Sequence, residues 1–362
     1  MEEKKVTWLE LFYDLLIVAA IATVTHVLLH VEEGDIPSEY LLKFVLIFIP
    51  IWWAWVGQTM FTNRFGQDLF HQRIFLILQM FFALVMISSL SVDFDSYYKP
   101  FLLGYIGLRA LISIQYFVAQ RTETGDRKKA ALFFGKYFLI GIFISICSVF
   151  FDSWIRYVIL YLGIFADISF PLIGRKHLVK VPTNTGHLLE RFGLFTIILF
   201  GETLVSTLSV IQPRQDDWHS IMFSLVSFIL IISMWWQYFD NLEKKVDKTK
   251  ETAGQMIIYG HLFILMSLSM IAASIRLLYL AEINYMFILL FIFGASLLYF
   301  SSTSLVFHLY RYEHQRLKIY HLSLFLGILA AFFLVNLAFT VPNIIIAGEL
   351  AIFFMIYAKI TT

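Results

Sequence analysis

Residues 284–308, NYMFILLFIFGASLLYFSSTSLVFH, form an apolar run. The run contains no Asp, Glu, Lys or Arg, and its single histidine is the last residue. A hydrocarbon core of about 30 Å is crossed by roughly 20 apolar residues in a helix with a rise of 1.5 Å per residue. The run is therefore long enough to cross a membrane as one α-helix. It lacks the apolar–polar alternation of a membrane β-strand, so it predicts an all-α membrane protein.

The composition of the whole chain supports the same class. Of 362 residues, 59% are hydrophobic and 15% are charged, whereas soluble domains carry about 25% charged residues. We therefore expect lipid to be the solvent. Cys147 is the single cysteine, which excludes an internal disulfide. We predict no cleaved signal peptide, because Glu10 and Asp14 interrupt the first apolar run.

Runs of similar length recur along the chain and predict a polytopic protein with about twelve transmembrane helices. They cover 7–30, 41–61, 73–92, 99–120, 130–150, 153–174, 187–210, 218–239, 254–280, 284–308, 318–340 and 342–359. Only Val341 and Pro342 separate the last two runs. The alternative is eleven spans followed by a re-entrant segment.

The basic residues indicate the orientation. With twelve spans, 19 of the 27 Lys and Arg residues lie on the side of the N-terminus. The opposite side has five, namely Lys43, Lys99, Arg156, Arg214 and Arg276, and the spans contain Arg109, Lys136 and Arg191. Because cytoplasmic loops are enriched in Lys and Arg, we predict a multi-pass protein of the cell membrane with both termini in the cytoplasm.

Two pairs of similar motifs indicate an internal duplication. LELFYDLLI at 9–17 resembles LERFGLFTI at 189–197, and a tandem Trp pair follows each motif, at 52–53 and at 235–236. We predict two parallel six-span repeats, 1–182 and 183–362, within one membrane domain. Coincidence between helices rich in Phe and Leu is the alternative.

Glu10 and Asp14 lie four residues apart in the first span, so they share a helix face. A charge near the bilayer centre costs at least about 2.5–3.5 kcal/mol, which makes such residues functional candidates. Two neighbouring carboxylates repel each other unless a cation bridges them or one of them holds a proton. Alternatively, Glu10 extends to the interface and only Asp14 is buried.

The seventh span begins GHLLERFGLFTIILFGETL and carries four ionisable candidates, His187, Glu190, Arg191 and Glu202. His187 and Arg191 share a face, and Glu202 lies on that face roughly 16 Å deeper. Glu190 points elsewhere and could meet a neighbouring helix. A protonated Glu202 with a purely structural hydrogen bond is the alternative.

Arg109 lies in the middle of the fourth span and cannot lose its proton. We expect it to pair with a carboxylate from another span. Candidate partners are Asp14, Glu202, Asp167 and Glu349, and the first two are preferred. His261 fits a hydrogen-bonded structural histidine better than a metal ligand. We predict no metal and no cofactor, and no phosphate-binding glycine loop indicates direct coupling to ATP.

Four motifs resemble the bacterial low temperature requirement protein A family. They are WLELFYDLLIVAAI at 8–21, NRF at 63–65, HLLERFGLFTIILFGETL at 187–204 and WWQYFD at 235–240. The resemblance implies a multi-span membrane protein of the bacterial inner membrane. It does not identify a substrate. This chain has Phe12–Tyr13 where the family has two Phe, and Gly66, Gln67 and one Asp68 where the family is more acidic. The first motif also has a looser similarity to channels built from two six-span repeats.

The leading functional hypothesis is a secondary transporter of an unknown small solute or ion, coupled through buried carboxylates; a channel is weaker. The predicted pathway residues are Glu10, Asp14, Arg109, Glu190, Arg191 and Glu202, and the predicted supporting residues are His187, Asn63, Arg64, Trp235, Trp236, Asp240 and His261. Rival hypotheses are a lipid-modifying enzyme that uses Glu190, His187, His261 and Asp240, and a non-catalytic sensor or scaffold. The expected partners are the lipid bilayer and the solute, with no nucleic acid; a homo-oligomer is an open alternative.

Overall fold

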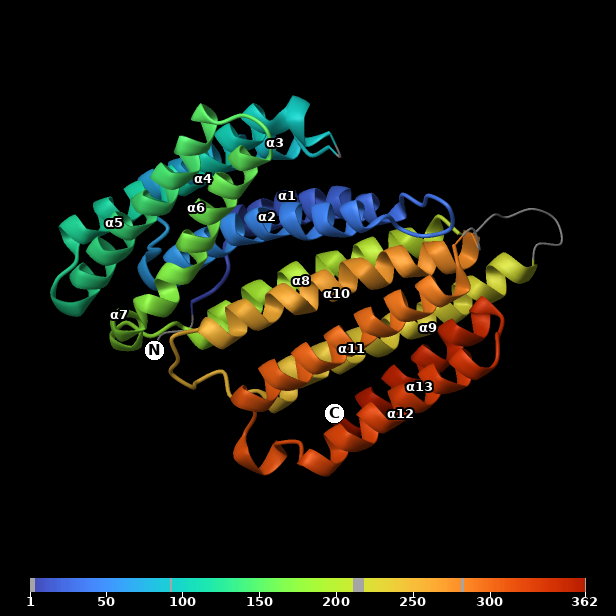
Figure 1. Cartoon of the computed structure of the whole chain (residues 1–362). Coiled ribbons are helices and arrows are strands. Elements are labelled where there is room, and N and C mark those ends of the chain that lie inside the picture. Colours follow the sequence, from blue (N-terminus) through green and yellow to red (C-terminus); the bar gives the residue numbers. More distant parts are fainter. Residues whose placement is uncertain (1–3, 92, 211–217, 281–282, 362) are drawn as a thin grey trace. The chain divides into compact units, whose positions relative to one another are not determined.

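The structure is a computed structural model that describes residues 4–91, 93–210, 218–280 and 283–361 (Figure 1). In these ranges the chain forms helices joined by short loops, and no β-strand occurs among them. Arg214 and residue 92, which belong to the sequence predictions above, lie outside the described residues.

Thirteen α-helices occur in the described residues, and one of them, α7, is short. They are α1 Trp8–Thr25, α2 Ser38–Phe65, α3 Phe70–Ile87, α4 Phe94–Thr122, α5 Gly125–Cys147, α6 Trp154–Ile173, α7 Arg175–Lys180, α8 Thr185–Leu208, α9 Trp218–Asp240, α10 Gln255–Leu280, α11 Tyr285–Tyr310, α12 Ile319–Ala338 and α13 Asn343–Thr361. Short 3₁₀ turns follow α1, α5 and α11, and a π turn, Asn241–Lys245, follows α9.

The twelve predicted runs coincide with the twelve long helices, so the polytopic all-α class is confirmed. Eleven of the described helices are long and apolar enough to cross a membrane by length and composition, with α1 and its 3₁₀ turn counted as one segment. The twelfth long helix, α8, carries Glu190, Arg191 and Glu202. At the C-terminal end, α12 and α13 are separate helices of 20 and 19 residues, as the twelve-span prediction requires.

The chain packs into two compact units. Unit 1 contains Met1–Ile21, Val45–Arg191 and Thr249–Ile258, and unit 2 contains Ala22–Phe44, Phe192–Lys248 and Tyr259–Thr362. The helices α1, α2, α8 and α10 each contribute residues to both units. This division describes which residues pack together, so the predicted duplication of 1–182 and 183–362 stays a prediction.

In unit 1, α3, α4, α5 and α6 pack against one another in succession. Glycines allow α5 and α6 to approach each other closely. A Cβ atom on Gly163 would lie 2.7 Å from the carbonyl oxygen of Gly141 and 2.2 Å from Ser145 Oγ. Small residues at such contacts let membrane helices gain van der Waals contact. Buried residues of α2, α4 and α5 form the largest part of an aromatic-rich core, with Phe61, Phe65, Ile112, Tyr116, Ala130, Ala131, Phe134 and Phe138.

In unit 2, α9 packs on α13, and α12 packs on both α11 and α13. Hydrogen bonds of buried tyrosines also join α11 to α9 and to α13. The Tyr299 hydroxyl of α11 donates to the carbonyl of Met234 in α9 at 3.1 Å. The hydroxyls of Ser304 in α11 and Tyr357 in α13 lie 2.7 Å apart. These buried hydroxyl groups are therefore satisfied by neighbouring helices, as a lipid environment favours.

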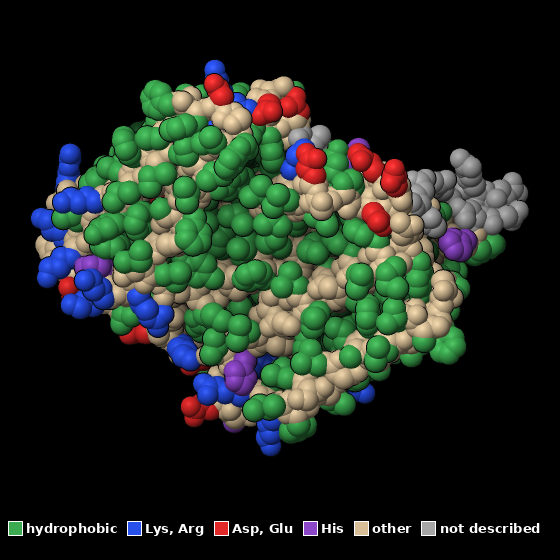
Figure 2. All heavy atoms as spheres, in the orientation of Figure 1, with side chains coloured by type: hydrophobic (Ala, Val, Ile, Leu, Met, Phe, Trp, Pro, Cys, Tyr) green, Lys and Arg blue, Asp and Glu red, His purple; other side chains and the backbone are tan. Residues whose placement is uncertain are grey.

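Large apolar side chains cover the outer sides of the helices. Phe143 of α5 and Phe165 of α6 are 67% and 69% exposed. Figure 2 shows hydrophobic side chains over the helix sides and Lys and Arg side chains gathered where α5 begins and α7 lies. An apolar side surface bounded by charged helix ends fits a chain that is surrounded by lipid.

Candidate functional site

Glu10 and Asp14 in the first two turns of α1 form the acidic part of the site. Both side chains are buried, with 3% and 0% of their surface exposed. They face the same way because a spacing of four residues places them on one helix face. The alternative in which only Asp14 is buried is therefore wrong.

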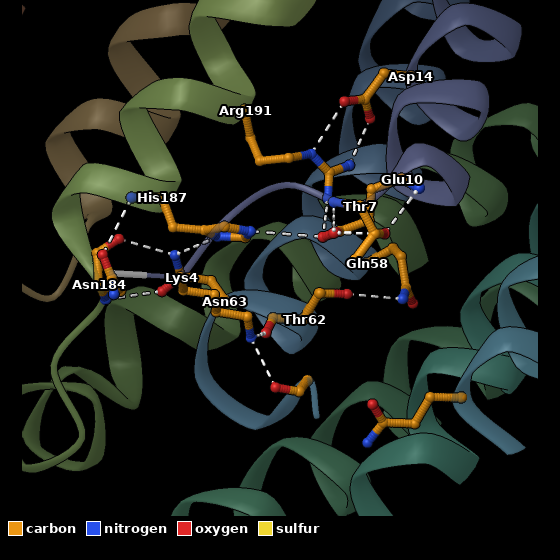
Figure 3. A network of polar contacts seen from close by, with 12 residues as sticks. Lys4, Thr7, Glu10, Asp14, Gln58, Thr62, Asn63, Asn184, His187 and Arg191 are labelled. Carbon is orange, nitrogen blue, oxygen red and sulfur yellow. Dashed lines mark hydrogen bonds and ion pairs between the residues drawn. The ribbon is translucent and has the colours of Figure 1, made fainter. Parts of the chain in front are cut away.

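Arg191 of α8 bridges the two carboxylates (Figure 3). Its Nη1 lies 2.7 Å from Glu10 Oε1, and its Nε and Nη2 lie 3.0 Å and 2.5 Å from the two Asp14 oxygens. The guanidinium is fully buried. A planar fork of N–H donors matches a carboxylate in this two-pronged geometry, and the positive charge offsets the repulsion between the acids.

Neighbouring residues donate further hydrogen bonds to both carboxylates. The Trp55 indole of α2 donates to Asp14 Oδ1 at 2.6 Å. The backbone N–H and the hydroxyl of Thr7 each donate to Glu10 Oε2 at 2.8 Å. Thr7 directly precedes α1, so Glu10 also satisfies a donor at the start of this helix. Each carboxylate is thus held by Arg191 and by one further residue.

His187 lies one turn before Arg191 and faces Glu10. Its Nε2 lies 3.6 Å from Glu10 Oε1. Asn63 Nδ2 lies 3.1 Å from His187 Nδ1, and Asn63 also bonds both the carbonyl and the N–H of Asn184. Because the Asn63 amide donates to Nδ1, a neutral His187 carries its proton on Nε2, toward Glu10. Of the predicted supporting residues, His187 therefore lies beside Glu10, and Asn63 contacts His187.

The formal charge of this acid cluster, which we define as Glu10, Asp14 and Arg191, is −1. Two carboxylates face one guanidinium, and all three side chains are buried. A buried net charge is unfavourable unless another charge compensates it. The arrangement therefore has the chemistry to take up one proton or one cation.

Arg109 of α4 pairs with a carboxylate of another helix, but its partner is Asp167 of α6. The Arg109 Nε atom lies 2.5 Å from Asp167 Oδ2, and both side chains are buried. The preferred partners, Asp14 and Glu202, were wrong. For Asp14 the physical reason is that Arg191 already occupies its two oxygens.

The two buried Arg–Asp pairs of unit 1 are built alike. Trp53 donates its indole N–H to Asp167 at 3.3 Å, as Trp55 does to Asp14. Arg109 also lies over the Phe138 ring, 4.5 Å from its centroid. The tandem pair in the sequence is Trp52–Trp53, but the indoles that bind the two acids belong to Trp53 and Trp55. A spacing of two along α2 lets these indoles reach different neighbours.

Three buried glutamines form a second polar group that sequence reasoning missed. Gln79 Nε2 of α3 and Gln115 Nε2 of α4 donate to Gln58 Oε1 of α2 at 2.6 Å and 2.9 Å. Gln58 Nε2 donates in turn to the hydroxyl of Thr62 at 2.9 Å. Within the described part of the chain, Gln79 Oε1 and Gln115 Oε1 accept no hydrogen bond. The signal was present, because each glutamine interrupts a predicted apolar span.

A cavity of about 500 Å³ connects these groups to the surface of unit 1. Exposed side chains, including Lys5, Gln67 and Arg73, line its outer part, and buried residues, including Glu10 and Gln115, line its inner part. The remaining lining residues are Lys4, Thr7, Leu9, Gln58, Phe61, Thr62, Asn63, Arg64, Gly66, Asp68, Gln72, Leu76, Arg127, Pro182 and Asn184. Glu10 therefore belongs both to the cavity wall and to the acid cluster.

Lys4 reaches into this cavity from the segment before α1 (Figure 3). Its ammonium donates to the carbonyl of Thr62 and, at 2.8 Å, to that of Gly66, at the end of α2. Cations are favoured at a helix C-terminus, where carbonyl groups lack partners within the helix. Burial nevertheless lowers the pKa of Lys4 to about 8, against the opposing effect of nearby Glu10.

Three other predicted residues, Glu190, Glu202 and His261, do not contact the acid cluster. Glu190 is exposed on α8. In unit 2, Glu202 Oε1 lies 3.8 Å from His26 Nε2, and the His261 ring lies 2.8 Å from the Tyr238 hydroxyl. These contacts do not include a residue of the acid cluster.

The tandem Trp pair of α9 is half-exposed and serves a local contact. Trp235 and Trp236 are 37% and 53% exposed. The Trp236 indole and the Lys244 ammonium each lie 2.8 Å from Asp240 Oδ2. Across the ranges that the structure describes, no three His, Cys, Asp or Glu side chains gather as a metal site. The chemistry of the site is that of buried ion pairs and amides.

Comparison with known proteins places this architecture in a family. The family model described as bacterial low temperature requirement A protein matches residues 5–358. An uncharacterised protein of Rhizobium meliloti (strain 1021), RA0937, is 27% identical over 285 residues, which cover 72% of this chain and 66% of that relative. The chain thus spans about two thirds of the length of this curated relative. Since the family match covers nearly the whole chain, the protein is a multi-span membrane protein that belongs to the bacterial low temperature requirement A family.

Proposed function

We propose that the protein is a secondary transporter whose coupling site is the acid cluster of Glu10, Asp14 and Arg191. The observation that carries the proposal is the double role of Glu10. Its carboxylate lines the cavity and also binds Arg191 at 2.7 Å. A solute or ion that enters the cavity can therefore act directly on a buried ion pair, as ion-coupled transport requires.

The charge of the cluster suggests how coupling would work. A proton or a cation that binds Glu10 or Asp14 competes with Arg191 for the same oxygens. A ligand shifts a conformational equilibrium only when it binds one state better than the other. A state in which Arg191 releases one carboxylate gains affinity for the proton or cation, so binding and rearrangement become linked.

We further propose that the cavity opens to the cytoplasm, together with both termini. The charge distribution in the sequence supports this orientation, because the cavity is lined by Lys5, Arg73 and Arg127 from the basic side of the chain. Cysteine labelling on intact cells tests it, in a Cys147→Ser background. Lys128→Cys should be protected from an impermeant maleimide, whereas Glu39→Cys should react. The reverse pattern would contradict the orientation.

Flux in proteoliposomes tests the transport function. Vesicles loaded with a pH-sensitive dye receive gradients of Na⁺, K⁺, inorganic phosphate and citrate in turn. We expect at least one gradient to move protons faster than in protein-free vesicles. Asp14→Asn and Glu10→Gln should reduce that flux at least tenfold, because each removes a titratable group from the cluster.

Glu190→Gln is the matched control for these variants. It removes a carboxylate from α8, one residue from Arg191, but Glu190 is exposed and lies outside the cluster. It should retain the flux of the unmodified protein. A flux that Asp14→Asn and Glu190→Gln change equally, or no flux with any of the four gradients, would overturn the proposal.

A further inference from the structure

The wall of the unit 1 cavity carries an excess of positive charge. Its basic side chains outnumber its acidic ones by five to two; they are Lys4, Lys5, Arg64, Arg73 and Arg127, against Glu10 and Asp68. Two of these cations are already paired: Arg73 donates to Asp68 at 2.7 Å and 2.9 Å, and Arg127 pairs with Glu123, which lies outside the wall, while Glu10 shares Arg191 with Asp14. Within the described residues, Lys4, Lys5 and Arg64 therefore remain as wall cations without an acid partner, and such an excess of positive charge attracts anions.

Arg64 is the most informative of these cations. It is 7% exposed, and its Nε and Nη2 donate to the carbonyls of Val181 and Ala253 at 2.9 Å and 2.8 Å. Its remaining Nη1 is directed at the Met60 sulfur at 3.9 Å. No carboxylate of the described ranges lies within ion-pair distance of it. A buried guanidinium without an acid is costly, so an anion in the cavity would relieve it.

Lys4 is a second wall cation without an acid partner in the described residues, and it is half-buried. It donates to the carbonyls of Thr62 and Gly66, which leaves one of its three N–H groups for a further acceptor. Among the residues that the structure describes, no acid forms an ion pair with it. The cytoplasmic excess of basic residues accounts for exposed cations such as Lys5, but not for cations that are withdrawn from water.

The cavity also offers a neutral acceptor. Gln115 is 1% exposed, lines the cavity, and its Oε1 lacks a donor in the described part of the chain. A hydroxyl group, or the proton of a partly protonated anion, would satisfy it. The volume of about 500 Å³ falls within the range of small-ligand sites.

We infer that this cavity binds a small oxyanion, a carboxylate or a phosphate group, through Lys4 and Arg64, with Gln115 as acceptor. The inference rests on the proposed function in one respect, since it names this anion as the solute that the transporter moves. The same oxyanion chemistry could come from a free solute or from the headgroup of an anionic lipid. The test separates these sources.

Calorimetric titration of the full-length protein in neutral detergent measures the binding. The probes are inorganic phosphate and citrate, soluble dihexanoyl phosphatidic acid with dihexanoyl phosphatidylcholine as its control, and ammonium. We expect saturable binding of phosphate or citrate at constant ionic strength. Lys4→Gln should weaken this binding about tenfold or more, because a charge-assisted hydrogen bond is lost.

Lys128→Gln is the matched control, since it removes one positive charge from an exposed position of α5 outside the cavity. It should bind as the unmodified protein does. Lys4→Arg should keep most of the affinity, and an unchanged elution volume verifies that the Lys4 variants fold. Equal affinity of Lys4→Gln and Lys128→Gln, or binding of ammonium alone, would overturn the inference.

The two proposals fail in different ways. Saturable binding of phosphatidic acid alone supports the oxyanion site and identifies a lipid headgroup as its source. Saturable phosphate or citrate binding without flux in proteoliposomes would leave the site in place and remove the transport function. Cation flux without any oxyanion binding would leave transport in place and remove this inference.

Discussion

At the scale of single residues, the polar interior depends on two arginines that each bind a buried acid. Arg191 holds Glu10 and Asp14, and Arg109 holds Asp167. Removal of one member leaves the other charged and uncompensated in a region of low dielectric. The acids held by Arg191 are tested by flux, as described above, and the pair formed by Arg109 is tested by stability.

Arg109→Ala should lower the stability of the protein by about 3–5 kcal/mol, because Asp167 would keep its charge without a partner. Arg109→Lys should restore only part of this loss. The guanidinium both pairs with Asp167 and lies over the Phe138 ring, and a compact ammonium group cannot make both contacts. Thermal unfolding in detergent measures both. Lys136→Ala, at an exposed position of α5, is the control. Equal melting temperatures for Arg109→Ala and Lys136→Ala would contradict the role of the pair.

The pH dependence of stability should report Lys4. Its pKa is about 8 in the folded protein, against an ordinary value of 10.5. Between these values the unfolded chain binds a proton that the folded protein has lost, so stability from this group rises as the pH increases from about 8 toward 10.5. Burial is the main cause, and the charges of Glu10, Arg127 and Arg191 also act on Lys4.

Melting temperatures of the unmodified protein and of Lys4→Gln, measured from pH 7 to pH 10.5, test this expectation. The difference between them should grow in favour of the unmodified protein above about pH 8. Two parallel curves would show that Lys4 titrates alike in the folded and the unfolded chain.

At the scale of elements, unit 1 depends on close helix contact through glycine. Gly163→Ala would place a methyl group 2.2 Å from Ser145 Oγ and 2.7 Å from the Gly141 carbonyl, so α6 must move away from α5. We expect a loss of about 1–3 kcal/mol, as for other overpacked cores. Gly327→Ala in α12 is the control, because an added Cβ there meets nothing within 4 Å. Thermal unfolding should rank Gly163→Ala well below Gly327→Ala, and the opposite order would show that α5 and α6 have room to adjust.

The helices themselves could be predicted from the sequence, and their ends only in part. Apolar runs of the right length located all twelve long helices, since lipid requires both apolar side chains and internal backbone bonds. The end of α2 was missed: the run 41–61 stops before the polar residues Thr62, Asn63 and Arg64, whereas the helix continues to Phe65. Asn63 and Arg64 extend it because their side chains bond Asn184 and Val181, which no local pattern reveals.

The sequence identified several residues of the candidate site but not how they pair. Charges inside apolar runs identified Glu10, Asp14, His187 and Arg191, because a buried charge is conspicuous in a membrane segment. Their pairing depended on which helices are neighbours, and that information is absent from the spacing along the chain. The three glutamines interrupt apolar runs, but an uncharged amide costs less in a membrane than a charge does, and a lysine near the terminus is not unusual in the sequence alone, so the glutamines and Lys4 were missed.

At the scale of the whole molecule, the family model matches residues 5–358, and the chain folds into two compact units. The predicted duplication is a separate property, and it stays a prediction. An experimental structure tests it directly: α1–α6 should superpose on α8–α13 with Glu10 near Glu190. Antiparallel α1 and α8 after superposition of the remaining helices would contradict it.

The formal charge of −1 on the acid cluster also has an electrical consequence. A charge that moves through the bilayer gains or loses about 2.3 kcal/mol per 100 mV when it crosses the whole membrane. A proton or cation on its way to Glu10 and Asp14 crosses part of that field, so turnover should depend on voltage. In the proteoliposome assay, a potassium diffusion potential set with valinomycin should change the initial rate by a factor that grows with the imposed voltage. A rate that stays constant from 0 to 100 mV would contradict this. A bacterium that depolarises its membrane would therefore change the rate of the transporter while the solute concentrations on both sides stay as they were.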